Sequence, residues 1–353
     1  MSTTRFPFSF LSSLLLLLSL LVLFNPVDAQ QRNRNGRTRN GGNRNTQQST
    51  PQQQAASVPQ GISTATDGST ILDSTVQLNG VPLRFKISAP SSQFTTLTDV
   101  PGSSAEPNST GELGVNVLLH GDGGQSFFDF PNQAVQGNQL GVALLAPSTN
   151  LLWGQRTGPA PGLDRADGAA DALLVRDFVK DVLPQLVAFD ASNVFFTGVS
   201  GGALLLSGFF MPVHLSEFAA EGNTNTGVLL MCGAMPPQVG GGGDSFPAAN
   251  ARVHYQSTTD ELQLLQGSIP DAIRAFEELA LAQGLSEAEV GRLQTVDNSP
   301  QGGHCEFDGQ GFVSGIQLVA DDFAAIMLEG GDGEVNGIGN VLTPVVGNEA
   351  LRF

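Results

Sequence analysis

The sequence predicts an α/β fold in which a mostly parallel β-sheet is covered by helices on both faces. Strand-like and helical runs alternate from about residue 114 onward, and parallel strands need such helical crossovers. Within that alternation, the stretch Asn193–Met211 reads as a short strand, a glycine-rich turn and an apolar helix. An Asn79-Gly80 pair between two earlier β-like runs predicts a hairpin at the start of the domain.

The first 29 residues are expected to be a signal peptide. Arg5 supplies the positive charge, Phe8 to Phe24 is a Leu-rich apolar core, and Val27-Asp28-Ala29 offers small residues for cleavage before Gln30. An N-terminal membrane anchor is the alternative, but no charged cluster follows the apolar run directly. We therefore expect a secreted, extracellular protein that has no membrane contact after cleavage.

Residues 30–60 are rich in Arg, Asn and Gln and are predicted to be a disordered tail, because they cannot bury a core. Its five arginines suggest docking to anionic polysaccharide or nucleic acid. A solvated spacer is the simpler interpretation. The folded domain is expected to span residues 61–353, which is long enough for one large α/β core.

Charge differs sharply between the tail and the domain. After residue 60 the chain has 32 acidic and 10 basic residues, a net charge of −22. Such a surface repels phosphates, so it disfavours nucleic acid and anionic membranes as partners of the domain.

The elements predicted in order begin with strands at Thr70–Leu78 and Val81–Ser88, where Pro82 suggests a sheet edge. The Ser/Thr/Pro loop that follows has the sequon Asn108-Ser109-Thr110, which predicts a surface N-glycosylation site at Asn108. Further strands are expected at Gly114–Leu119, Gly141–Leu145, Val194–Thr197, Thr226–Met231 and Arg252–Gln256. Helices are expected at Ala169–Phe189, where Pro184 ends or kinks the last turn, after the glycine-rich turn, at Asp271–Ala282 and at Leu318–Leu328.

Ser200 is the predicted nucleophile. It lies in Gly198-Val-Ser-Gly-Gly202, between the Val194–Thr197 strand and the apolar helix. A strand, a G-x-S-x-G turn and a helix in succession form a nucleophile elbow, which exposes the serine on a tight turn. A structural glycine turn is the alternative.

A second glycine-rich loop, His120-Gly121-Asp122-Gly-Gly124, follows the Gly114–Leu119 strand. Its backbone suits an oxyanion hole, with the N–H groups of Asp122 and Gly201 as the two donors. The Asp122 carboxylate should point away, because it would oppose a developing negative charge. His120 is expected to brace this loop rather than act as the base.

The predicted base is His304, which lies in a glycine-flanked loop late in the chain, and the predicted acid is Asp260, just past the Arg252–Gln256 strand. Asp297 and Glu261 are alternatives for the acid. Two cysteines in a secreted chain favour one disulfide, Cys232–Cys305, over two free thiols. No metal or cofactor motif is present in the sequence, so neither is expected.

These residues resemble the α/β-hydrolase superfamily. Leu118-Leu-His-Gly121, Asp190-Ala-Ser-Asn-Val194, Phe196-Thr-Gly-Val-Ser-Gly-Gly202 and Gly303-His304 are similar to secreted polyhydroxybutyrate-depolymerase-like and feruloyl-esterase-like enzymes. The resemblance implies a serine esterase that acts through an acyl-enzyme, without metals, on polysaccharide-linked, polyester or small esters. Trp153 is then a candidate wall of the substrate pocket, with ordinary packing as the alternative.

We expect a monomer whose partner is an ester substrate. Two other functions stay open at this point. One is a non-catalytic secreted binding protein on a hydrolase scaffold, which Asp122 and the atypical loop before Asp260 favour. The other is a serine peptidase, because hydrolysis of an amide uses the same groups.

Overall fold

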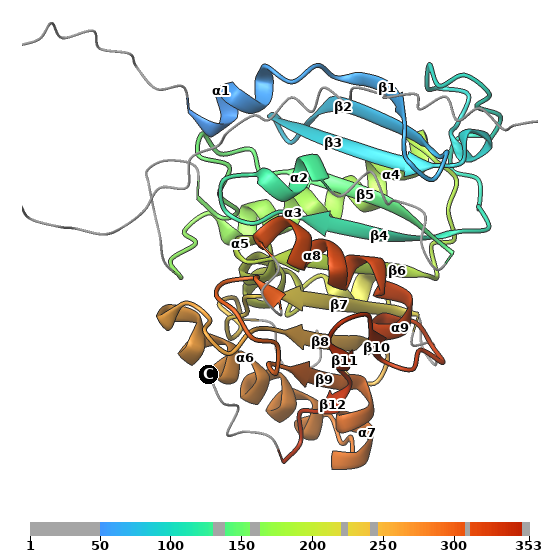
Figure 1. Ribbon diagram of the computed structural model, residues 1–353. Helices are drawn as coiled ribbons and strands as arrows, with labels where there is room; N and C mark the ends of the chain where they lie inside the picture. The colour runs from blue at the N-terminus through green and yellow to red at the C-terminus, as the bar shows by residue number, and fades with distance from the viewer. Residues whose placement is uncertain are drawn as a thin grey trace, which may run out of the picture. The chain divides into compact units, whose positions relative to one another are not determined.

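A single mixed β-sheet organises the computed structural model, which describes residues 50–129, 138–155, 163–219, 225–240, 246–307 and 311–347 (Figure 1). The strand order is β1-β2-β3-β5-β4-β6-β7-β8-β9-β12. These strands are β1 (Gly61–Thr64), β2 (Thr70–Leu78), β3 (Val81–Ala89), β4 (Gly114–Leu119), β5 (Gln139–Leu145), β6 (Val194–Val199), β7 (Thr226–Met231), β8 (Arg252–Gln256), β9 (Gln294–Asp297) and β12 (Thr343–Pro344). A separate two-stranded ribbon pairs β10 (Glu334–Val335) with β11 (Gly339–Asn340).

Strands β5, β4, β6, β7, β8 and β9 are parallel neighbours, whereas β1, β2 and β3 at one side and β12 at the other pair antiparallel. This confirms the predicted mostly parallel α/β sheet. The central strand β6 is buried along its whole length. Because both faces of the central strands are covered, the sequences of β6 and β7 are nearly continuous apolar runs.

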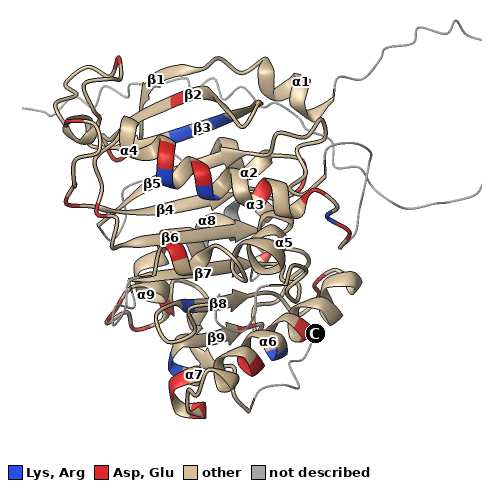
Figure 2. Ribbon diagram, turned by 180° about the vertical axis from the view of Figure 1, so that it is seen from behind, with Lys and Arg blue, Asp and Glu red and all other residues tan. Residues whose placement is uncertain are grey.

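Helices cover both faces of the sheet. On one face lie α3 (Gly168–Asp177), α4 (Leu183–Leu186), α5 (Gly201–Leu205) and α6 (Gln263–Ala282), seen in front in Figure 2. The other face packs against α2 (Gln125–Asp129), α8 (Phe312–Asp321) and α9 (Phe323–Met327). Alternate residues of β6 enter the two cores, Phe196 on the first face and Phe195 on the second. The remaining helical segments are α1 (Pro51–Ala56), α7 (Glu287–Leu293), the 3₁₀ turns η1 (Ser91–Gln93) and η5 (Leu215–Glu217), and the π-helical turns η3 (Phe178–Val182) and η4 (Leu206–Phe210).

The hairpin predicted at Asn79-Gly80 is present, with Leu78 paired to Val81 and positive φ at both turn residues. The edge position inferred from Pro82 is wrong, because β3 lies between β2 and β5. Pro82 is tolerated since the ladder with β5 begins only at Arg84.

The helix expected at Ala169–Phe189 is interrupted near Pro184, as the sequence indicates. It runs as α3, passes through the π-helical turn η3 and ends as the short α4. Pro184 has no N–H group to offer the preceding turn, which loosens the hydrogen-bond ladder before it.

The predicted boundary between tail and domain at residue 60 is wrong. Helix α1 already begins at Pro51 with a capping box formed by Thr50 and Gln53, and Ala55 is buried. The signal peptide and the remainder of the tail, up to residue 49, lie outside the described residues. Within the part of the chain that is described, no helix is both long and apolar enough to cross a membrane.

A buried ion pair attaches α1 to the sheet. Arg84 of β3 binds the Asp73 carboxylate of β2 with both Nε and Nη2 at 2.8 Å, and the side chains are 7% and 9% exposed. Figure 2 shows the acidic position on β2 and the basic positions on β3. The same guanidinium donates to the carbonyls of Ala55 and Val58, at the C-terminal end of α1.

We expect Arg84→Met to lower the free energy of unfolding by about 3 kcal/mol, because it leaves the Asp73 carboxylate buried without a counter-charge. The double variant Asp73→Leu/Arg84→Met should recover most of that loss. Chemical denaturation measures both. Arg274→Met is the matched control, since the Arg274–Asp271 pair is 49% and 52% exposed and should contribute less than about 1 kcal/mol. Equal losses at Arg84 and Arg274 would contradict this account.

Candidate active site

Ser200 occupies the sharp turn between β6 and α5. Its backbone has φ 49° and ψ −110°, a conformation that residues with a side chain rarely adopt. The turn is tight enough that a Cβ added to Gly198 would meet the Cα of Ala203 at 2.6 Å. Hydrogen bonds hold the turn: the Ser200 N–H donates to the Met231 carbonyl at 2.8 Å, and the Ser200 carbonyl accepts from Leu204 at 3.0 Å.

The structure brings Ser200 and His304 together, as the sequence analysis expects. The Oγ of Ser200 is 2.9 Å from Nε2 of His304, and Nδ1 of His304 is 2.5 Å from Oε1 of Glu261. Because a carboxylate oxygen only accepts, Nδ1 carries the ring proton and Nε2 is free to accept from the serine hydroxyl. The His304 side chain is 20% exposed and that of Glu261 is fully buried.

The residue that contacts His304 is therefore Glu261, and the predicted acid Asp260 is wrong on this geometry. The Asp260 N–H donates to the Gly302 carbonyl at 3.1 Å, and Asp260 itself is exposed. The alternative Asp297 accepts from Gln256 at 2.8 Å instead. Glu261 lies two residues before α6, and its longer side chain reaches Nδ1 of the imidazole.

Three hydrogen bonds fix the Glu261 carboxylate and its loop. Oε2 accepts from the Ser257 hydroxyl at 3.2 Å, and Oε1 also accepts from the Leu262 N–H at 2.8 Å. The Thr258 hydroxyl donates to the Gly303 carbonyl at 3.0 Å, which joins the acid loop to the histidine loop. These contacts restrict the orientation of the imidazole.

The predicted disulfide is present between Cys232, the residue after β7, and Cys305, with the two Cα atoms 5.4 Å apart. It attaches the residue next to His304 to the strand beside β6. Ligand atoms of Cys232, His304 and Cys305 lie within 4.8 Å of one another. Both sulfurs are committed to the disulfide, so this cluster offers no thiolate for a metal.

His120 braces the loop after β4. Its Nδ1–H donates to the Gly121 carbonyl at 2.6 Å, and its Nε2 accepts from the Ala146 N–H at 2.9 Å. Burial lowers the pKa of His120 to about 4, so the ring is neutral at physiological pH. In a trans peptide the carbonyl and the next N–H point in opposite directions. Fixing the Gly121 carbonyl therefore also fixes the direction of the Asp122 N–H.

The side chain of Asp122 lies against Gly201. A Cβ added to Gly201 would come within 1.9 Å of Oδ1 of Asp122 and within 3.3 Å of its backbone nitrogen, so a larger residue there would displace this carboxylate. The expectation that this carboxylate simply turns away is thus incomplete. Its charge is balanced by Arg165, whose Nη1 and Nη2 each donate to it at 2.8 Å. Arg165 lies in no recognisable sequence motif, so the sequence does not predict its contact with Asp122.

Trp153 does not line an open pocket, which corrects one of the two interpretations of that residue. Its side chain is completely buried in the core and its ring centroid is 5.3 Å from that of His120. The apolar sequence around it, Leu151-Leu152, is the signal that favours packing. Asn108 is exposed and has φ 61°, so the sequon is at the surface and glycosylation stays a prediction.

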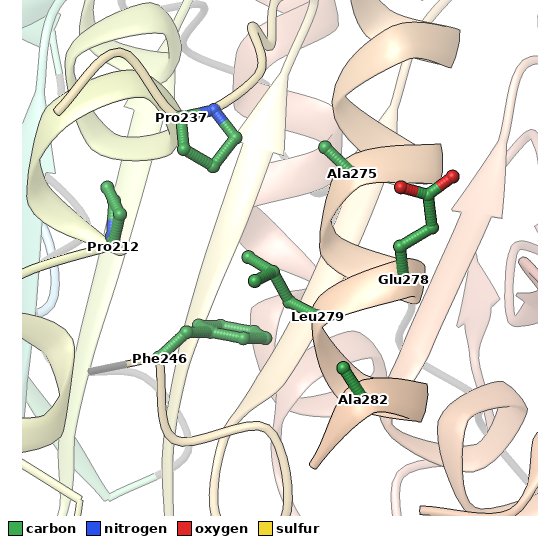
Figure 3. Close-up of a pocket in the computed structure, with 7 residues that line it drawn as sticks. All are labelled: Pro212, Pro237, Phe246, Ala275, Glu278, Leu279 and Ala282. Carbon is green, nitrogen blue, oxygen red and sulfur yellow. The ribbon is translucent and has the colours of Figure 1, made fainter. Parts of the chain in front are cut away.

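An apolar pocket of about 400 Å³ lies between the end of η4 and helix α6 (Figure 3). None of its lining residues belongs to the Ser200 site; they are Pro212, Pro237, Phe246, Ala275, Glu278, Leu279 and Ala282. This pocket has a mainly hydrophobic lining with one carboxylate, that of Glu278.

Comparison with solved structures finds similar chains at low identity. A CIB-like hydrolase from Thermoplasma acidophilum is 12% identical, with 72% of this chain and 99% of that chain covered and a TM-score of 0.43. A feruloyl esterase module from Clostridium thermocellum, complexed with sinapinate, is 12% identical with 73% and 88% covered and a TM-score of 0.44. Esterase 2 of Thermogutta terrifontis, phosphoramylated by tabun, is 15% identical with 71% and 93% covered and a TM-score of 0.42.

No protein-family model matches the sequence, and comparison with curated proteins gives no match. The chemistry of the site therefore has to be argued from the residues of this chain.

We expect acid to destabilise the fold through two buried histidines. Burial lowers the pKa of His254, as it does that of His120, to about 4, from an ordinary value of 6.5. Between those two pH values the unfolded chain binds protons that the folded chain excludes, so stability falls as the pH drops from 6.5 to 4. Each histidine should account for about 3 kcal/mol of that fall.

Denaturation curves from pH 7 to pH 4 measure this loss. In wild type, His254 bonds Thr295 and Gln256 through its two ring nitrogens. The variant His254→Gln has no group that titrates at this position, so its fall in stability should be shallower by about one histidine's share. Identical pH slopes for the variant and the wild type would contradict the assignment.

Proposed function

We propose that this chain, which has the α/β-hydrolase fold, is a secreted serine hydrolase that cleaves carboxylic esters through an acyl-enzyme. The single observation that carries the proposal is the placement of His304 between Ser200 and Glu261, at 2.9 Å and 2.5 Å. A nucleophile, an acid and a base in that chain order, together with a strand–turn–helix elbow at the serine, are the working parts of this fold.

In the proposed first step, Ser200 Oγ attacks the ester carbonyl while His304 Nε2 takes the hydroxyl proton. A bond forms between Oγ and the carbonyl carbon, and the carbonyl π electrons move to oxygen. The tetrahedral intermediate then collapses, and His304 returns the proton to the departing alkoxide. Water repeats the sequence on the acyl-enzyme and releases the carboxylic acid with Ser200 restored.

The roles of the remaining groups follow from their contacts. Glu261 holds His304 in the tautomer that accepts at Nε2 and stabilises the imidazolium that forms. The N–H groups of Asp122 and Gly201 are proposed to bind the oxyanion, because the backbone nitrogen of Asp122 is 3.3 Å from the position that a Cβ on Gly201 would take. His120 keeps the first of these donors in place.

A carboxylic ester is the proposed substrate class, since an alkoxide leaves more readily than an amine. Candidate substrates are esters on cell-wall polysaccharides, polyesters and small esters. Turnover of p-nitrophenyl esters of increasing acyl length, of methyl ferulate and of acetylated xylan, set against an amide of matched structure, separates these and tests the peptidase alternative. Asp122 no longer favours the binding-protein alternative, because Arg165 balances the charge of its carboxylate.

Ser200→Ala should reduce ester turnover by at least about 1000-fold and abolish covalent labelling by a fluorophosphonate probe, because no other hydroxyl replaces Oγ. Mass spectrometry of the labelled wild type should place the adduct on Ser200. The variant Ser207→Ala is the matched control, since its hydroxyl donates to the Ala203 carbonyl in the helix that follows. Unchanged turnover in Ser200→Ala would refute the proposal.

Glu261→Gln should lower kcat by about 100-fold or more, because an amide cannot stabilise the imidazolium in the same way. Asp260→Asn, one residue earlier in the same loop, should change kcat by less than about threefold. Steady-state kinetics on one p-nitrophenyl ester compare the two. The reverse ranking would restore Asp260 as the acid and overturn the assignment of Glu261.

A further inference from the structure

Arg165 forms the one ion pair that the described residues place beside the proposed oxyanion donors. It lies in the loop before α3, and its Nη1 and Nη2 donate to Oδ1 and Oδ2 of Asp122, each at 2.8 Å. The arginine side chain is 2% exposed, against 28% for the aspartate. Two parallel charge-assisted hydrogen bonds give this pair a defined orientation as well as an attraction.

The position of the Asp122 carboxylate makes its charge matter. It belongs to the residue whose N–H is one proposed donor, and Oδ1 lies 1.9 Å from the position that a Cβ on Gly201 would take. The Gly201 N–H is the other proposed donor. A bare carboxylate there would repel the negative charge that develops on the substrate oxygen. A counter-charge at the same place removes that repulsion.

We propose that Arg165 is a positioning residue for the reaction. It neutralises the Asp122 carboxylate and holds it side-on against Gly201, so that both backbone donors act on the oxyanion without an opposing charge. This inference rests on the proposed function. The domain has 10 basic residues against 32 acidic ones, and one of these few basic side chains, that of Arg165, is almost completely buried beside Asp122.

The surrounding loops keep the guanidinium in place. Nη1 of Arg165 also donates to the carbonyl of the buried Trp153 at 3.1 Å. The arginine Cβ lies 2.7 Å from where a Cβ on Gly154 would be, so the side chain is packed directly on that glycine. The Gly123 N–H donates to the Leu151 carbonyl at 3.0 Å, which joins the oxyanion loop to the loop that holds Arg165.

The test is a cycle of two substitutions measured with one p-nitrophenyl ester. Arg165→Met keeps the length of the side chain and removes its charge, leaving the carboxylate bare. We expect kcat to fall about 10- to 100-fold while KM changes less than about threefold, because the loss falls on the transition state. Asp122→Asn removes the carboxylate charge but keeps the backbone N–H, and it serves as the reference for the double variant.

The double variant Asp122→Asn/Arg165→Met decides the matter. Without a carboxylate there is no charge for Arg165 to balance, so kcat should return to within about threefold of Asp122→Asn. If the double variant is as slow as Arg165→Met, the arginine acts only as a structural support and the inference is overturned. Arg165→Lys provides a second test if Arg165→Met does not fold, and it should retain most of the wild-type kcat.

Two controls separate this inference from the proposed function. Arg176→Met, at a partly exposed arginine on α3 whose partners are Asp177 and Glu217, should leave kcat unchanged. Wild type and Ser200→Ala are assayed and probed with the fluorophosphonate in parallel. A wild-type protein that is neither active nor labelled overturns the proposed function and this role of Arg165 together. An active wild type with a slow double variant overturns the role of Arg165 alone.

Discussion

Ser200 is held in a backbone conformation that costs an isolated residue about 1–3 kcal/mol, and its neighbourhood is built to sustain it. The strand before it is buried throughout and paired on both sides, so the chain enters the turn from a fixed direction. The Met231 carbonyl receives the Ser200 N–H, and Cys232, the next residue, is bound to Cys305 beside the base. This strained turn thus requires glycine at 198, and the disulfide attaches the residue next to His304 to the same region.

Charges around the site are controlled by three different physical means. His120 is kept neutral by burial, which lowers its pKa and lets one ring nitrogen donate while the other accepts. Glu261 is fully buried as an acceptor of hydrogen bonds from Ser257 and from a backbone N–H. Asp122 is only partly buried and is matched by a cation. The burial of these two carboxylates is tolerated because each accepts hydrogen bonds from neighbouring donors.

Local sequence patterns predict much of this fold, but they do not predict contacts between residues far apart in the chain. The bounds of β2, β4, β7 and β8 follow from apolar runs between turn residues. Strands β9 and β12 were missed because four and two residues are too short to show a period. Helix α6 begins eight residues before the expected start at Asp271, and it contains Pro270. Asp260 and Glu261 are adjacent acids, and only the packing of the loop distinguishes them. The partner of Asp122 lies 43 residues away, with no local signal.

The disulfide closes a ring of chain whose ends are 73 residues apart, and that ring contains β8, α6, α7 and β9 together with Glu261. The base lies within it, one residue before Cys305. A cut at the exposed Gly284, in the turn between α6 and α7, would leave both fragments covalently joined as long as the bond stays oxidised. Glu261 and His304 would then remain attached to the sheet after such a cut. The disulfide would thus hold the two fragments together as well as fix the position of the loop that contains His304.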